Sequence, residues 1–411
     1  MPNTKSFVIV GAGMAGARAA ETLRSDGFED RIFLIGDEGR LPYERPPLSK
    51  ECLVGTKPVE VADLRAWEDW MDMAVHLVMN DRVGSVDTSE GAVVLSSGLR
   101  IRADKVLLAT GGVAKKLNVP GMTLAGVHTL RTVDDCEALG DRLRRGRLRV
   151  TVVGGGFLAA EVASAACTLG NDVTWIDRAR VPLTGTVGGH TASELSERYA
   201  SSALTVMSAS TVASIDGIDA VTGVTLDSGV TVPTDVVLVA IGQHPSLGYL
   251  DRAQFGSGRG LPVDERLESA VPGVFAAGDV ANFVDPYMGG RTRHGTWMNA
   301  QNQGRFAARA MMGSSTAYCD VPWCWSDHFG INVQIAGRVD ETADIVERRH
   351  ASGAVSTFYV DGDRLVGAVG VDAQRDIRAA MLIMERGSRV DREALADSTT
   401  DLRRLGKEPV A

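Results

Sequence analysis

The chain has 411 residues, 44% of them hydrophobic and 23% charged, which is typical of a globular protein and exceeds what one hydrophobic core usually supports. Its net charge of −9 argues against a general nucleic-acid-binding protein. No stretch approaches the ~18 apolar residues of a membrane-spanning helix, and the short polar segment 1–7 does not resemble a signal peptide, so we expect a cytoplasmic protein.

A dinucleotide-binding pattern opens the chain. A strand predicted over 6–10 runs into a helix over 17–24 through a loop whose glycines are Gly11, Gly13 and Gly16. A second strand, over 31–35, ends beside Asp37. The first glycine permits a tight turn, the second lets the backbone approach a pyrophosphate, and the third allows close packing of helix on strand. The helix N-terminus supplies an anion site, and Asp37 is placed to bind a ribose hydroxyl.

The same pattern recurs after a strand predicted over 149–153. The loop that follows holds Gly154, Gly155, Gly156 and, at the third fingerprint position, Ala159. The next strand, over 172–176, ends in Asp177, and two such units predict two dinucleotides in one chain. A carboxylate at Asp177 accepts a hydrogen bond from a 2′-hydroxyl and repels a 2′-phosphate, which favours NADH. The neighbouring Arg178 and Arg180 leave NADPH open.

Two more buried strands, predicted over 105–111 and 274–280, end in small residues. Their ends carry Ala109, Thr110, Gly111, Gly278 and Asp279. These sequences look like the ATG and GD motifs of flavoprotein reductases that bind two dinucleotides. The resemblance implies FAD on the first glycine-rich loop and NAD(H) on the second, with Asp279 beside the ribityl or phosphate oxygens of the flavin.

Further motifs resemble one group of these reductases. They are PYERPPLSK (42–50), LRTVDD (130–135), WMNAQ (297–301), PWCWSD (322–327) and QRDIR (374–378). Together they span nearly the whole chain and are similar to the NADH:ferredoxin reductases of the putidaredoxin-reductase type, which serve cytochromes P450 and aromatic-ring dioxygenases. The resemblance implies a glutathione-reductase-like α/β fold: two interleaved Rossmann-like domains and a C-terminal α+β domain.

The resemblance also implies functional residues. Lys50 and Glu161 fall on an ion pair at the flavin N5 edge and are the expected catalytic residues. The implied cofactor-binding residues are Gly11, Gly13, Gly16, Asp37, Arg45, Lys50, Ala109, Thr110, Gly111, Arg131, Gly154, Gly156, Glu161, Asp177, Gly242, Gly278, Asp279, Trp297 and Trp325. Core packing is the alternative for either tryptophan. No metal site is expected.

Glu161 is informative without the resemblance. It lies in an otherwise small and apolar helix, where a carboxylate costs several kcal/mol unless it is paired or faces a ligand. Lys50, which follows a diproline, is the expected partner. A purely structural ion pair is the alternative to a functional one.

The chain departs from the family pattern at a few positions. Val113 replaces an arginine near the flavin, Gly295 and Thr296 replace acidic or amide residues, and His328 replaces a glutamine. His328 alone is a weak candidate for a redox role. These departures leave the flavin potential and the choice of partner open.

Cysteine usage separates the subfamilies. The five cysteines at 52, 136, 167, 319 and 324 contain no CxxC or CxxxxC pair, and only Cys52 lies near the expected flavin region. We therefore expect structurally inert thiols. Without a thiol relay, electrons must leave the flavin directly, which suits a one-electron acceptor outside the chain.

The expected domains are interrupted in sequence. Residues 1–112 and 239–317 form the FAD domain, 113–238 the NAD domain, and 318–411 an antiparallel sheet with helices. In that last domain we predict strands over 332–336, 354–360 and 364–371 and a helix over 375–385, with 386–411 peripheral.

The expected function is electron transfer from NADH through FAD to a [2Fe-2S]-type ferredoxin serving a cytochrome P450 or a Rieske oxygenase. The alternatives are an NADH oxidase or rubredoxin-type reductase, and a redox-sensing flavoprotein like apoptosis-inducing factor. Because such ferredoxins are acidic, docking needs a basic patch, for which Arg291, Arg293, Arg305 and Arg309 are candidates. Solvated arginines are the alternative. We expect a monomer or weak homodimer that binds neither nucleic acid nor membrane.

Overall fold

The computed structural model describes residues 4–199, 204–256 and 258–405, which divide into two compact units. Unit 1 comprises residues 1–45, 60–113 and 244–320, and unit 2 comprises 46–59, 114–243 and 321–411. The expected NAD domain and C-terminal domain thus fall into one unit, together with the segment 46–59. The three-domain division with its boundaries at 112, 238 and 317 stays a prediction.

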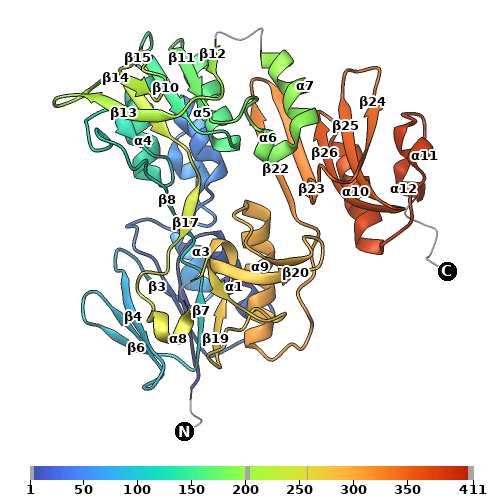
Figure 1. The fold of residues 1–411 in the computed structure, drawn as a ribbon. Helices are drawn as coiled ribbons and strands as arrows, with labels where there is room; N and C mark the ends of the chain where they lie inside the picture. The colour runs from blue at the N-terminus through green and yellow to red at the C-terminus, as the bar shows by residue number, and fades with distance from the viewer. Residues whose placement is uncertain (1–3, 200–203, 257, 406–411) are drawn as a thin grey trace. The chain divides into compact units, whose positions relative to one another are not determined.

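Unit 1 is built on a parallel sheet of five strands in the order β19-β7-β1-β2-β3 (Figure 1). These strands are β1 (Ser6–Val10), β2 (Arg31–Ile35), β3 (Val75–Val78), β7 (Lys105–Leu108) and β19 (Val274–Ala276). All five residues of β1 are buried because strands pair with it on both sides. The order, with β1 in the middle, is that of a dinucleotide-binding domain.

Two helices of unit 1 pack against each other beside this sheet. They are α1 (Met14–Ser25), which follows β1, and α9 (Trp297–Met311), some 280 residues later in the chain. A Cβ on Gly304 would lie 2.2 Å from the carbonyl oxygen of Ala15, so only glycine permits this approach. One turn earlier on α9, the side chain of Gln301 accepts a 3.2 Å hydrogen bond from Arg18 on α1.

The remaining elements of unit 1 are short. The strands are β4 (Val83–Asp87), β5 (Ala92–Leu95), β6 (Arg100–Arg102), β18 (Leu261–Pro262), β20 (Ala281–Asp285) and β21 (Gly290–Thr292). The helices are α3 (Trp67–Asp72), α8 (Arg252–Phe255) and the 3-10 turn η3 (Gly278–Val280). The short strands β8 (Gly112–Ala114) and β17 (Gln243–Pro245) and the turn η2 (Val59–Ala62) lie where the chain passes from one unit to the other.

Unit 2 contains a second parallel sheet, of order β12-β11-β10-β16-β9. Its strands are β9 (Val127–His128), β10 (Arg149–Val153), β11 (Asp172–Ile176), β12 (Leu204–Met207) and β16 (Val236–Val239). The helix α5 (Phe157–Thr168) connects β10 to β11 and is buried along most of its length. This sheet repeats the arrangement of unit 1, as the second fingerprint predicts.

Further elements of unit 2 frame this sheet. The helices are η1 (Pro46–Ser49), α2 (Glu51–Val54), α4 (Val133–Leu143), α6 (Thr184–Val187) and α7 (Gly189–Tyr199). A three-stranded antiparallel sheet follows, made of β13 (Val212–Gly217), β14 (Val221–Leu226) and β15 (Thr231–Pro233).

The C-terminal part of unit 2 is an antiparallel sheet of order β22-β23-β26-β25-β24. Its strands are β22 (Trp323–His328), β23 (Ile331–Gly337), β24 (Asp344–Arg349), β25 (Val355–Asp361) and β26 (Arg364–Val371). The predicted strands over 332–336, 354–360 and 364–371 are confirmed within one residue at each end, and β22 and β24 were missed. The helix α10 (Gln374–Arg386) packs on β23 and β26 and confirms the predicted helix.

The segment predicted to be peripheral, 386–411, is mostly exposed in its described part, yet it is anchored at two points. The helices α11 (Arg392–Ala396) and α12 (Leu402–Leu405) bury Leu395 and Leu402. Arg348, itself 3% exposed, donates hydrogen bonds to the carbonyls of Leu395, Asp397, Ser398 and Thr400. A buried arginine that finds four carbonyl acceptors can hold this segment against β24, which a count of charged residues does not reveal. Residues 406–411 lie outside the described residues.

Candidate functional site

The first glycine-rich loop has the geometry that its sequence predicts. Gly11 has a φ of +113°, and a Cβ there would lie 2.3 Å from the carbonyl oxygen of Ala109 at the end of β7. A Cβ on Gly16 would lie 1.9 Å from the carbonyl oxygen of Gly11. Gly13 caps α1, and nothing lies within 4 Å of its missing Cβ. The loop is therefore closed at Gly11 and Gly16 and open at Gly13, as a site for a dinucleotide pyrophosphate requires.

The ATG and GD motifs lie in the same unit as this loop. Thr110 donates a 2.6 Å hydrogen bond to the carbonyl of Ser246, and the backbone N–H of Ser246 donates to the carbonyl of Gly111. Gly278 follows β19, and a Cβ there would lie 3.3 Å from the side chain of Ala15 on α1. Its N–H donates to the side chain of Gln303 at 2.8 Å. These contacts hold both motifs at the carboxyl ends of β7 and β19, the edge where dinucleotide domains bind their ligands.

Some secondary-structure boundaries at this edge differ from the predicted ones. The strand predicted over 105–111 ends at Leu108, and the one predicted over 274–280 ends at Ala276. In the second case the 3-10 turn Gly278–Val280 replaces the last strand residues, since Gly278 has a φ of +75°, which a strand does not accommodate. Asp279 in this turn is 7% exposed.

The acid expected to bind a ribose in this unit lies at the surface. Asp37 is exposed and forms a 3.0 Å ion pair with Arg82. Its neighbour Glu38 instead accepts a 2.6 Å hydrogen bond from the Tyr43 hydroxyl and pairs with Arg45 at 3.1 Å. The structure thus brings together Glu38, Tyr43 and Arg45, and Glu38 is a second candidate beside Asp37 for the ribose acid of this unit. Sequence reasoning chose Asp37 because it follows the strand directly.

The second glycine-rich loop repeats the first. Gly154 has a φ of +131°, and a Cβ there would lie 2.2 Å from the carbonyl oxygen of Ala240. Gly156 caps α5 and has open space at its missing Cβ. A Cβ on Gly155 would lie 2.0 Å from a carboxylate oxygen of Asp177, so the Asp177 side chain rests directly on the loop. The acid is therefore adjacent to the backbone that would hold a pyrophosphate, which fits the adenosine ribose of a second dinucleotide.

The surroundings of Asp177 bear on cofactor choice. Asp177 is 9% exposed, and one carboxylate oxygen accepts a 3.3 Å hydrogen bond from the backbone N–H of Ala179. Arg178 and Arg180 are exposed side chains. A buried carboxylate facing the loop opposes a phosphate on the ribose, whereas solvated arginines are screened and contribute little.

Lys50 and Glu161 meet inside unit 2. The Lys50 ammonium lies 2.8 Å from Oε1 of Glu161, with 19% and 9% of the two side chains exposed. The same Oε1 accepts a 2.7 Å hydrogen bond from the hydroxyl of Ser326, which is completely buried. The hydroxyl of Ser49 donates to Oε2. Two hydroxyls and one ammonium therefore satisfy a carboxylate that would otherwise be destabilised by burial.

Three separate segments supply these groups. Ser49 ends the turn η1 and Lys50 follows it; Pro46 and Pro47 start this turn, and proline is favoured at the first position of a helix. Glu161 faces inward because α5 consists almost wholly of small residues and packs closely. Ser326 lies on β22, which packs against α5. The predicted pair is present, and sequence reasoning missed both serines although each stands inside a motif that it quoted.

Other expected residues of unit 2 lie as follows. Trp325 on β22 stacks on Trp323, with ring centroids 5.2 Å apart. Gly242, the residue before β17, has a φ of +95°. The backbone N–H of Arg131 donates to the side chain of Asp135 at the start of α4. His328 is 3% exposed, and burial together with the nearby Lys50 charge lowers its pKa to about 4. It is a buried neutral imidazole.

Three of the five cysteines have the character of inert thiols. All five lie in described residues, and no disulfide joins them. Burial raises the pKa of the Cys136 and Cys324 thiols to about 12 and that of Cys167 to about 11. A thiol with a raised pKa forms little thiolate at neutral pH and is a poor nucleophile. These three thiols are thus unsuited to a redox relay.

Two glycine-rich loops, one on each of two parallel sheets, define a two-dinucleotide oxidoreductase fold. Family comparisons agree: residues 5–304 match the model of pyridine nucleotide-disulphide oxidoreductases, and residues 323–406 match the C-terminal reductase domain. Within residues 4–199, 204–256 and 258–405, none of the helices has the length and apolar character needed to cross a membrane.

Individual relatives narrow the class. The chain is 36% identical to the ferredoxin–NAD(+) reductase component of the anthranilate 1,2-dioxygenase system of Burkholderia cepacia, over 97% of this chain and 98% of the relative. It is 34% identical to rhodocoxin reductase of Rhodococcus erythropolis, over 97% and 93%. It superimposes on the reductase of the covalent putidaredoxin reductase–putidaredoxin complex with a TM-score of 0.92 and 27% identity, over 98% of each chain. The chain therefore belongs to the pyridine nucleotide-disulphide oxidoreductase family, in its group of ferredoxin–NAD(+) reductases.

Truncating Glu161 tests the buried pair. Glu161→Ala leaves the Lys50 ammonium and two hydroxyls without their acceptor, and removing one partner of a buried pair typically destabilises by about 3–5 kcal/mol. We expect the low end of that range because Lys50 keeps some contact with solvent. Urea unfolding of the FAD-loaded protein measures the change.

Glu51→Ala is the matched control, because Glu51 pairs with Lys57 at the surface at 3.6 Å. Such a pair is worth about 0–1 kcal/mol. Equal destabilisation by both variants would contradict the view that the Glu161 carboxylate is held by buried donors.

Proposed function

We propose that this chain binds FAD on the glycine-rich loop of unit 1 and NADH on that of unit 2, and passes electrons from NADH to an iron–sulfur ferredoxin. The observation that carries this proposal is the pair of glycine-rich loops. In each, the first glycine lies against the backbone at the end of a neighbouring strand, and the glycine that caps the following helix, Gly13 or Gly156, has open space beside it. When bound, FAD supplies the two-electron to one-electron chemistry. The chain's task is to bind both dinucleotides, orient them and exclude water.

The proposed roles follow from position. Gly11, Gly13, Gly16 and Gly154, Gly156 present the N-termini of α1 and α5 to the two pyrophosphates. Glu38, with Arg45 beside it, binds the adenosine ribose of FAD, in place of Asp37. The strand ends at Ala109, Thr110, Gly111, Gly278 and Asp279 line the rest of the FAD site, with Trp297 at the start of α9.

In unit 2, Asp177 binds the NADH ribose, and Lys50 with Glu161 forms a fixed pair of charges at the reacting rings. Arg131, Gly242 and Trp325 complete the proposed cofactor contacts. The pair fits a reaction in which the charge of a ring system changes. Charges that are already held in place in a nearly dry site can stabilise the new charge without having to move first.

Cofactor preference tests the role of Asp177. We expect NADH to be used at least about tenfold better than NADPH in kcat/KM, equivalent to ~1.4 kcal/mol. Asp177→Asn removes the charge that repels a 2′-phosphate and should narrow the ratio, chiefly through KM for NADPH. Steady-state ferricyanide reduction with both nucleotides measures it. Asp172→Asn, an exposed acid at the start of the same strand, is the control. Equal use of both nucleotides by the unchanged protein would contradict the assignment.

The proposed partner is an acidic [2Fe-2S]-type ferredoxin of a cytochrome P450 or Rieske oxygenase system. The names of the relatives support this, and one solved relative is joined to putidaredoxin. NADH and ferredoxin are both cytosolic, so we place the reaction in the cytoplasm. A monomer or weak homodimer remains part of the proposal.

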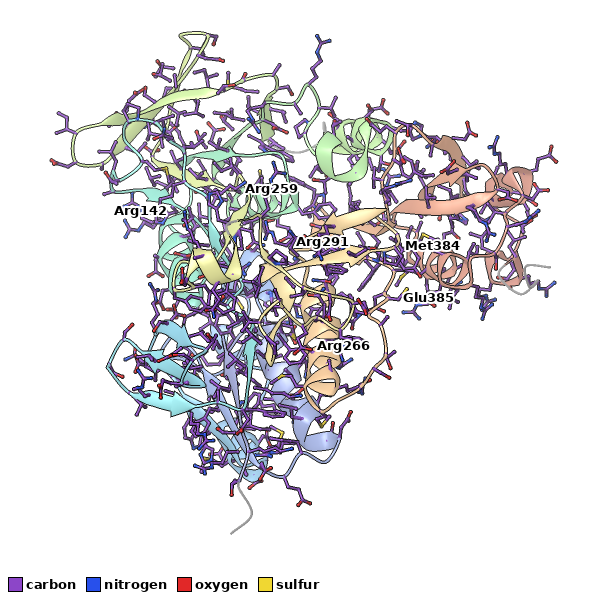
Figure 2. All side chains as sticks on the ribbon, turned by 60° about the horizontal axis from the view of Figure 1, so that its bottom comes forward. Arg142, Arg259, Arg266, Arg291, Met384 and Glu385 are labelled. Carbon is purple, nitrogen blue, oxygen red and sulfur yellow. The ribbon has the colours of Figure 1, made fainter. Side chains whose placement is uncertain are left out.

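The four candidate docking arginines all lie in unit 1, and their contacts differ. Arg291, labelled in Figure 2, donates to the carbonyls of Val263 and Asn282, and Arg293 donates to the carbonyl of Asp279. Arg309 pairs with Asp26 at 2.8 Å, which offsets its charge. Arg305, one turn earlier on α9, is exposed. We therefore place the largest share of the docking charge on Arg305.

Charge reversal tests both the partner and the docking site. NADH-driven cytochrome c reduction should require added ferredoxin and weaken as salt rises. Arg305→Glu should raise KM for ferredoxin about three- to tenfold, because it turns an attraction into a repulsion. Arg309→Glu should have a smaller effect because Asp26 already lies beside it.

Two controls separate the outcomes. Arg252→Glu makes the same charge change on α8 of the same unit and should leave the ferredoxin KM unchanged. Ferricyanide reduction should be unchanged in all three variants. Cytochrome c reduction at full rate without ferredoxin would contradict the proposed partner, whereas unchanged ferredoxin kinetics in Arg305→Glu would move the docking site elsewhere.

A further inference from the structure

A line of buried polar side chains continues from Glu161 into the interior of unit 2. The Ser326 hydroxyl, bonded to Glu161, lies 3.0 Å from Nδ1 of His328. On the other side of the ring, Nε2 of His328 lies 2.5 Å from the hydroxyl of Tyr199, the last residue of α7. Ser326, His328 and Tyr199 are 0%, 3% and 5% exposed.

The chemistry of these groups fixes the direction of every hydrogen bond. The Glu161 carboxylate, paired with the Lys50 ammonium, can only accept. The single proton of the Ser326 hydroxyl is therefore used on Glu161, so Nδ1 of His328 must donate to Ser326. A neutral imidazole that is protonated on Nδ1 has a lone pair on Nε2, which accepts from the Tyr199 hydroxyl.

His328 and Tyr199 keep their protonation states at neutral pH. Burial and the Lys50 charge hold the pKa of His328 at about 4, so the ring becomes a cation only in acid. Burial raises the pKa of the Tyr199 phenol, so the hydroxyl stays a donor.

The groups that face His328 come from three other elements. Lys50 follows η1, the ring of Phe157 lies on α5, and the ring of Tyr199 lies on α7. Phe329 packs edge-on against the imidazole from the following residue. Apart from the line itself, the imidazole thus has aromatic neighbours, and Tyr199 is the group that favours the Nδ1-protonated ring from the Nε2 side.

We propose that Tyr199 and His328 are positioning residues which, by fixing the imidazole tautomer, turn the Ser326 hydroxyl onto Glu161 and hold that carboxylate beside Lys50. This inference deepens the proposed function, on which it rests, because the carboxylate is the group assigned to the reacting rings. Removing the Tyr199 hydroxyl frees the imidazole to protonate Nε2 instead. Nδ1 then becomes an acceptor that competes with Glu161 for the Ser326 proton.

Nitrogen-15 NMR of histidine-labelled, FAD-loaded protein tests the tautomer directly, without NADH or ferredoxin. The signal of His328 is assigned by its loss in His328→Gln. We expect Nδ1 protonated and Nε2 bare at neutral pH, and a shift toward the Nε2-protonated form in Tyr199→Phe. An Nε2-protonated ring in the unchanged protein, or no change of tautomer in Tyr199→Phe, would overturn the proposal.

Kinetics then test the consequence. Tyr199→Phe should slow flavin reduction by NADH about fivefold with NADH affinity unchanged, as expected for a weakened hydrogen bond to a charged group. His328→Gln should keep the rate within about twofold, because an amide can donate to Ser326 and accept from Tyr199. His328→Leu should slow flavin reduction about as much as Tyr199→Phe does, because leucine offers neither a donor nor an acceptor.

Tyr359→Phe is the matched control, since Tyr359 is a buried tyrosine of unit 2 whose hydroxyl bonds the carbonyl of Val187. It should match the unchanged protein in both measurements. Equal slowing by Tyr359→Phe would show a general effect of buried tyrosine loss and overturn the positioning role. If the tautomer behaves as expected but NADH does not reduce the flavin, the hydrogen-bonded line stands and the proposed function fails.

Discussion

A carboxylate that can only accept hydrogen bonds, buried in an otherwise small and apolar helix, constrains much of unit 2. Glu161 is stable there because Lys50, Ser49 and Ser326 supply donors to both of its oxygens. These donors come from segments more than 100 residues away on either side in sequence. Each donor must be held in place if the buried charge is to be stable. The ion pair therefore requires η1, α5 and β22 to keep their positions relative to one another.

Contacts farther from Glu161 hold these donor segments in position. The segment 46–59 belongs to unit 2 although residues on both of its sides belong to unit 1. Its helix α2 packs on α4, and the carbonyl of Leu53 accepts from Arg144. At the other end, Ser326 is oriented by His328 and Tyr199. A site that holds opposite charges at fixed positions in a nearly dry interior has the preorganisation that charge-changing chemistry uses.

Much of this structure could be predicted because the constraints are local. The two glycine loops could be predicted because their reason is steric. A Cβ on Gly11 or Gly154 would collide with the backbone at the end of a neighbouring strand, so glycine is required at a fixed place in the motif. The Lys50–Glu161 pair could be predicted because a lone acid in an apolar helix needs a partner. Three of the five strands of the C-terminal sheet, β23, β25 and β26, could be predicted from their runs of apolar residues.

Other features depend on packing that sequence patterns do not carry. The choice between Asp37 and Glu38 depends on which side chain Arg82, Tyr43 and Arg45 can reach. The packing of the C-terminal segment against β24 depends on Arg348 donating to carbonyl groups some 50 residues later. His328 looked isolated in sequence, since Tyr199 lies 129 residues before it.

The most direct test of the central claim is a double-mixing stopped-flow experiment without oxygen. The yellow, FAD-loaded protein is first mixed with NADH and then with oxidised ferredoxin, while the flavin absorbance is followed. The proposed function predicts rapid bleaching in the first step and rapid return of the yellow colour in the second. A reduced flavin that persists with ferredoxin and is reoxidised only when oxygen is admitted would contradict it.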